Sequence, residues 1–169
     1  MPTYLNKFCG ITFHHAIMLN TFLIICLLLF IPLSAKIGER IKNPRKILGF
    51  SSLILIILAY PIYSLLLTKS DILYFISLLL IALSIAPVMA FIPIILIDYL
   101  PIEVRYTGLA IAYNIAYSIF GGIIPLIATY LIHITNDLLI PAYIIICAAL
   151  VTLSGLLFHA APTYISEEA

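Results

Sequence analysis

Three tyrosines and an asparagine within residues 106–117 are the side chains best suited to bind a solute. At 100° per residue, Tyr106, Tyr113 and Tyr117 fall within about 40° of one another on a helix, with Asn114 beside them. Tyrosine rings attract quaternary ammonium groups and tyrosine hydroxyls can hydrogen-bond a carboxylate, so this face suits a zwitterionic solute. Tyr113, Asn114 and Tyr117 are therefore candidate substrate-binding residues. The alternative for each is that it only holds membrane helices together.

The histidines and cysteines do not form a pattern that predicts catalysis or metal binding. His14 and His15 are adjacent, so they point to different sides of a helix, and neither has a carboxylate or cysteine at ligand spacing. Cys9, Cys26 and Cys147 are scattered and odd in number, which argues against a disulfide framework. We expect no enzyme activity, no metal site and no cofactor.

The composition indicates the elements that position these residues. Of 169 residues, 64% are hydrophobic and 9% are charged, with a net charge of +1, which excludes an ordinary soluble domain and gives no sign of a nucleic-acid partner. Long uncharged stretches exceed the roughly 20 residues needed to cross a bilayer. They predict an all-α polytopic membrane protein whose surroundings are the lipid bilayer. A single transmembrane domain over residues 1–169 would hold five helices, with spans near 12–35, 47–67, 73–98, 106–132 and 139–159.

The distribution of Lys and Arg predicts the orientation, because cations in short loops are retained on the cytoplasmic side. One end of the spans carries cations at positions 36, 40, 42, 45, 46 and 105, whereas the other end carries Lys7 and Lys69. We therefore expect an external amino terminus and a cytoplasmic carboxyl terminus in the cell inner membrane.

Two further features favour a moving bundle that has lost an amino-terminal part. Prolines occur within the spans, where each interior one removes a backbone hydrogen bond and bends its helix. They are at positions 32, 61, 87, 93, 125 and 141. An external start followed by an odd number of spans is also unusual for a complete protein, which predicts a missing segment ahead of residue 1.

Part of the sequence resembles a known transporter family. The stretch from Leu96 to Pro141 reads LIDYLPIEVRYTGLAIAYNIAYSIFGGIIPLIATYLIHITNDLLIP. It resembles the tenth-to-twelfth-helix region of the major facilitator superfamily, and within it the metabolite:proton symporters of the proline/betaine type. Pro2 to Leu5 is similar to the external end of that family's seventh helix. The resemblance implies the carboxyl-terminal half of a twelve-helix bundle, an incomplete transporter half lacking most of its first helix.

A second resemblance lies after the first span. The loop from Leu33 to Lys46 is similar to the family signature Gly-x-Leu-Ser-Asp-Arg-x-Gly-Arg-Arg, although Ala35 stands where the family has an acid and Glu39 where it has a base. The resemblance implies that gating residues lie here and at the next cytoplasmic turn, namely Ser34, Lys36, Gly38, Arg40 and Arg105. The alternative is a solvated cluster of charges that only sets the topology.

The resemblance implies a truncated or split secondary active transporter of the proline/betaine:proton symporter type, not competent alone. Its partners would be a small zwitterionic solute, a proton and a separately encoded amino-terminal half. Besides histidines, the spans offer no ionisable group for a proton within the membrane, because Asp98, the nearest acid, adjoins the cytoplasmic loop. In the family this machinery is associated largely with the amino-terminal half. The alternative is a non-transporting membrane protein, either a degenerate remnant or a small helix-packing subunit.

Overall fold

The structure is a computed structural model that describes residues 2–39, 43–68 and 70–158. A short helix, α1 (Pro2–Phe8), precedes three long helices, α2 (Phe13–Glu39), α3 (Pro44–Leu66) and α4 (Asp71–Asp98). A 3-10 turn, η1 (Ile102–Val104), leads into α5 (Arg105–Thr135), and α6 (Ile140–Phe158) follows. Within these residues there is no strand. Each of the five long helices is long and apolar enough to cross a membrane, which confirms the predicted helical membrane fold.

Local sequence explains where several helices begin and end. Asn43 caps α3, because its side-chain oxygen accepts a hydrogen bond from the Lys46 backbone N–H at 3.3 Å, and Pro44 occupies the first turn. At the end of α5, Asn136 adopts the left-handed conformation with φ 55°, and its N–H donates to the Ile132 carbonyl at 2.9 Å. The Asp137 carboxylate then accepts from the Leu139 N–H at 2.8 Å. The turn between α5 and α6 is therefore encoded locally.

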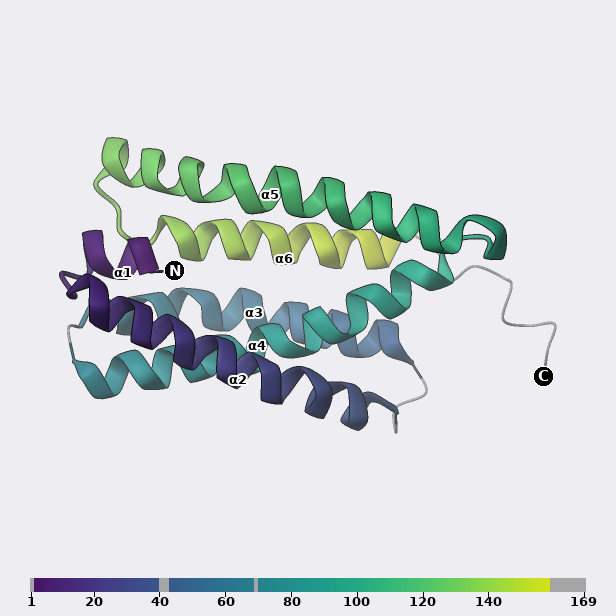
Figure 1. Ribbon diagram of the computed structural model, residues 1–169, viewed down its shortest axis with the longest axis horizontal. Coiled ribbons are helices and arrows are strands. Elements are labelled where there is room, and N and C mark those ends of the chain that lie inside the picture. The colour runs from purple at the N-terminus through teal and green to yellow at the C-terminus, as the bar shows by residue number, and fades with distance from the viewer. Residues whose placement is uncertain (1, 40–42, 69, 159–169) are drawn as a thin grey trace.

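The helices form two groups that run along the same axis (Figure 1). α4 packs against both α2 and α3, and α3 packs against α6. α5 lies on the outer side of α6 and makes few contacts with the rest of the molecule. Among the described residues of α5, Ile132 is the one that is buried. α5 is thus the most weakly covered of the long helices.

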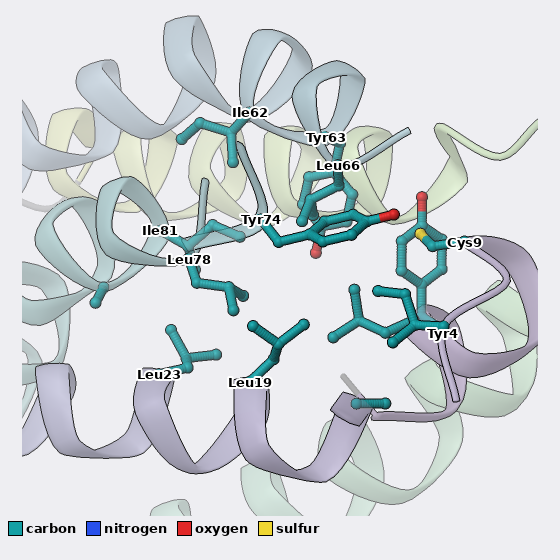
Figure 2. Packing of buried hydrophobic residues seen from close by; sticks show 14 of the residues in the cluster. Tyr4, Cys9, Leu19, Leu23, Ile62, Tyr63, Leu66, Tyr74, Leu78 and Ile81 are labelled. Atoms are coloured by element: carbon teal, nitrogen blue, oxygen red, sulfur yellow. The ribbon is translucent and has the colours of Figure 1, made fainter. Parts of the chain in front are cut away.

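The main core lies where α1, α2, α3 and α4 meet (Figure 2). Leu19 of α2, Leu66 of α3 and Leu78 of α4 are fully buried there, and Tyr4 and Cys9 close the cluster at the end near α1. Buried serines in α3 and α4 donate to carbonyls one turn earlier in their own helix, as Ser77 does to Leu73 at 2.7 Å. Their hydroxyls are therefore satisfied without a partner helix.

Candidate functional site

A groove between α4 and α5 contains two of the three candidate substrate-binding residues. It encloses a cavity of about 280 Å³ whose seven lining residues are Met89, Ile92 and Leu96 of α4 and Ala112, Tyr113, Ala116 and Tyr117 of α5. None of these seven is charged. Ala112 and Ala116 lie one turn apart and leave space beside the helix backbone, so the two tyrosine rings border the cavity.

The structure brings Tyr113 and Tyr117 together and leaves Asn114 apart. The two tyrosine rings stack with their centroids 5.5 Å apart and an interplanar angle of 25°. Tyr113 is half-buried and Tyr117 is 59% exposed. Asn114 is exposed and does not line the cavity, and Tyr106, at 89% exposed, does not line it either. Of the three candidate residues that the sequence spacing placed near one helix face, the structure therefore puts only the two tyrosines at the cavity.

The first part of the segment from Leu33 to Lys46, which we expected to be a loop, is helical. α2 continues to Glu39, so Ser34, Lys36 and Gly38 lie in its last turns, with Ser34 half-buried and Lys36 exposed. The sequence from Leu33 to Ile37 contains no proline or glycine that would break a helix, and the helix therefore extends beyond the apolar span. Arg40 lies outside the described residues.

Gly38 of α2 packs directly against the side chain of Phe91 in α4. It is buried, and a Cβ atom added to it would lie 1.9 Å from Cζ and 2.6 Å from Cε1 of Phe91 in α4. Phe91 is 3% exposed. Glycine is required here because its missing side chain creates the space for the Phe91 ring, and this contact fixes the end of α2 against α4.

Arg105 begins α5, and its Nε donates to the Leu100 carbonyl at 3.4 Å across the preceding turn. A second arginine at this end was not among the candidates. Arg45, in the first turn of α3, donates from Nη2 to the Tyr99 hydroxyl, and its guanidinium carbon lies 5.4 Å from the Tyr99 ring centroid. No sequence signal could have paired these residues, because they are 54 positions apart.

A second cavity, of about 280 Å³, lies between α1, α3, α5 and α6. Tyr4, Phe8 and Tyr63 contribute aromatic rings to it, and Tyr4 packs edge-on against Tyr63 at 5.8 Å. The Tyr4 hydroxyl donates to the Leu138 carbonyl at 2.8 Å, which ties α1 to the turn after α5. Burial, and to a smaller extent the nearby Cys9, Tyr63 and Asp137, raise the pKa of Tyr4.

Comparison with known proteins identifies transporters. The chain is 29% identical over 161 residues to a glycine betaine/proline/ectoine/pipecolic acid transporter of Dickeya dadantii, covering 94% of this chain and 31% of that protein. It is 28% identical over 154 residues to the proline/betaine transporter of Escherichia coli K12, covering 90% and 30%. A citrate-proton symporter of Klebsiella pneumoniae is 29% identical over 144 residues, covering 84% and 32%.

The chain thus spans about a third of the length of these relatives. No family model and no solved structure matches it. The similarities confirm the resemblance to proton symporters of the major facilitator superfamily, and the expectation of a transporter-like protein in place of an enzyme. In the part of the chain that the structure describes, no group of three or more His, Cys, Asp or Glu could hold a metal ion.

Proposed function

We propose that this chain forms one wall of the solute path of a proton-coupled symporter for a small zwitterion such as proline or betaine. The observation that carries the proposal is the Tyr113–Tyr117 pair in the groove between α4 and α5. The similarity to proline/betaine transporters over most of the chain supports it. The five apolar helices and the similarity to transporters indicate a multi-pass membrane protein of the transporter type, whatever the role of this pair.

The chemistry of the groove favours a zwitterion over a polyanion. Citrate-proton symporters are also among the relatives, and citrate carries several negative charges. An uncharged, largely apolar cavity would leave those charges without a cation and make their desolvation costly. The ring of Tyr117 can instead stabilise a quaternary ammonium group by a cation–π contact, and tyrosine hydroxyls can donate to one carboxylate.

The second wall would come from a separate amino-terminal half. α5 exposes apolar and aromatic side chains on several sides, including Tyr117, Phe120, Leu126 and Tyr130. Asn114 is exposed and does not line the groove, so it would contact solute only if another segment enclosed that side of α5. Transporters of this kind move one bundle against another around a shared site, so one wall alone would not transport.

The proposal includes the orientation of the chain and its gate. The amino terminus would lie outside and the carboxyl terminus in the cytoplasm, with the helices in the inner membrane. Ser34, Lys36, Gly38, Arg40 and Arg105 would line the cytoplasmic side. An acid at position 35 would pair with cations and help to hold the cytoplasmic side closed, and Ala35 cannot do this. The packing of Gly38 on Phe91 would supply part of that closure instead.

The test is uptake of radiolabelled proline and betaine in transport-deficient cells. The chain alone should give none, whereas co-expression with a matching amino-terminal half, encoded by a flanking reading frame, should restore proton-gradient-dependent uptake. In that complex, Tyr117→Leu should abolish uptake. Tyr106→Leu is the matched control, because Tyr106 is also exposed on α5 but lies outside the groove.

Uptake by the chain alone would refute the need for a second half, and equal uptake by the two tyrosine variants would refute the groove as the site. Failure of any flanking product to co-purify with the chain or to restore uptake would favour the non-transporting alternative. Citrate uptake in place of betaine uptake would overturn the proposed solute class.

A further inference from the structure

The cavity of about 280 Å³ between α1, α3, α5 and α6 has no role in the transport proposal, and all of its walls belong to this chain. It lies at the end of the molecule that holds α1 and the turn between α5 and α6 (Figure 1). None of the twelve residues that line it is charged. Pockets for drug-sized ligands begin at about 300 Å³, so this cavity suits a small solute without net charge.

Three aromatic rings border the cavity, and each is inclined to its neighbour. Phe8 and Tyr4 of α1 have ring centroids 5.8 Å apart and planes at 46°. Tyr4 and Tyr63 of α3 also lie 5.8 Å apart, with planes at 69° (Figure 2). Inclined rings enclose a small volume from more than one side, which is how aromatic cages hold quaternary ammonium groups.

The Tyr63 hydroxyl is a buried donor without a partner. Tyr63 is 5% exposed and lines the cavity. No described residue shares a hydrogen bond with its hydroxyl, whereas the Tyr4 hydroxyl donates to the Leu138 carbonyl at 2.8 Å. Buried polar groups in folded proteins are nearly always hydrogen-bonded, so an unpartnered hydroxyl at a cavity wall indicates that an acceptor binds there.

We propose that this cavity is a second binding site for a small zwitterion, with the carboxylate at the Tyr63 hydroxyl and the ammonium group against the rings of Tyr4 and Phe8. The class of solute rests on the proposed function, and the cavity matches it because one wall offers a donor and another offers aromatic rings. In the predicted orientation this end of the bundle faces outside. The site would therefore hold solute on the external side of the groove between α4 and α5.

The test measures binding to the purified 169-residue chain by equilibrium dialysis with three radiolabelled probes. Betaine carries both charged groups. Its carbon isostere, in which carbon replaces the ammonium nitrogen, keeps the shape and the carboxylate but lacks the positive charge. Tetramethylammonium keeps the positive charge and lacks the carboxylate. Because the whole cavity is built from this chain, no second half is needed, so failure of binding here and failure of uptake in the co-expressed complex are separate results.

Two variants address the two ends of the solute, each with a matched control. Tyr63→Phe removes the hydroxyl and keeps the ring, and Tyr60→Phe is its control, because Tyr60 is 49% exposed on the same helix and does not line the cavity. Phe8→Leu removes one ring, and Phe75→Leu is its control on α4, outside the cavity. Tyr63→Phe loses no hydrogen bond within the described chain, so its thermal unfolding should match that of the native chain.

We expect betaine to bind more tightly than either of the other probes. Tyr63→Phe should weaken betaine binding about tenfold, the effect of one hydrogen bond to a charged group, and leave tetramethylammonium binding unchanged. Phe8→Leu should weaken both about fivefold, the effect of one cation–π contact. The two control variants should stay within about twofold of the native chain.

Four results would overturn the proposal. Absence of betaine binding to the chain would remove the site. Equal binding of betaine and its carbon isostere would show that the rings hold no ammonium group. Equal effects of Tyr63→Phe and Tyr60→Phe would exclude the hydroxyl as the carboxylate contact. Loss of binding in Tyr117→Leu but not in Tyr63→Phe would assign the bound solute to the groove between α4 and α5, which would support the proposed function and refute a second site.

Discussion

The contact between Gly38 and Phe91 predicts that replacing a single hydrogen atom by a methyl group destabilises the bundle. In Gly38→Ala the new Cβ would lie 1.9 Å from Cζ of Phe91, whereas real Cβ contacts essentially never fall below 3.0 Å. The Phe91 ring is 3% exposed and cannot simply move into open space. The end of α2 or the ring of Phe91 must shift by more than an ångström.

The magnitude follows from two opposing effects. Overpacking a well-filled site costs about 1–3 kcal/mol. Replacing glycine by alanine in a helix gains up to about 1 kcal/mol from backbone entropy. Gly49→Ala isolates the second effect, because its Cβ would lie 3.9 Å from Cδ1 of Leu153 and of Leu156, an ordinary contact. We therefore expect the free energy of unfolding of Gly38→Ala to lie about 1–3 kcal/mol below that of Gly49→Ala.

The assay is unfolding of the purified chain in mixed micelles, followed by helical circular dichroism as the denaturing detergent is increased. Phe91→Leu lacks the ring atoms Cζ, Cε1 and Cε2 that the new methyl group would meet. Adding Gly38→Ala to Phe91→Leu should then cost much less than adding it to the native chain, so the two substitutions should be coupled by more than about 1 kcal/mol. Additive effects within about 0.5 kcal/mol, or equal stability of the two alanine variants, would refute this account of Gly38.

Two further predictions concern the opposite end and the orientation. Tyr4→Phe removes the hydrogen bond to the Leu138 carbonyl and should cost about 1 kcal/mol at neutral pH. The pKa of Tyr4 is raised in the folded state, so its contribution to the free energy of unfolding is complete below the unfolded pKa near 10 and is lost as the pH rises above that value. Above pH 10 the stability of Tyr4→Phe should therefore fall less steeply than that of the native chain. Parallel stability curves for the two proteins would contradict this. In a chain without its native cysteines, a cysteine at Asn136 should react with an impermeant maleimide added outside intact cells, and one at Asn43 only after the membrane is opened. The reverse pattern would overturn the predicted orientation and the assignment of the cytoplasmic gate.

The exposed apolar surface has a simple physical explanation. Ile111, Ile115, Ile119 and Ile123 lie along one side of α5 and all are exposed, at 54%, 54%, 47% and 48%. In water this stripe would be strongly unfavourable, but lipid chains are as apolar as isoleucine and impose no such cost. A spacing of four residues places these isoleucines on one side of a helix, and the structure leaves that side uncovered.

The class of protein and its five spanning helices follow from the amino-acid sequence alone. Hydrocarbon offers no hydrogen-bond partners, so each apolar stretch of bilayer length must satisfy its own backbone as a helix, and that constraint acts locally along the chain. Local chemistry also determined the caps at Asn43 and Asn136. The end of α2 was misplaced by several residues, because the charged residues after Ser34 mark the edge of the apolar span and do not stop a helix that can continue into the interface.

Which side chains meet depends on how the helices pack in three dimensions. Helical periodicity put Tyr113, Asn114 and Tyr117 near one face, but the position of α4 decided that the two tyrosines border a cavity and Asn114 does not. The pairs Gly38–Phe91 and Arg45–Tyr99 each join segments more than 50 residues apart. The helix period specifies which direction a side chain points, whereas the neighbour it meets depends on how distant helices cross, and that is set by the packing of the whole bundle.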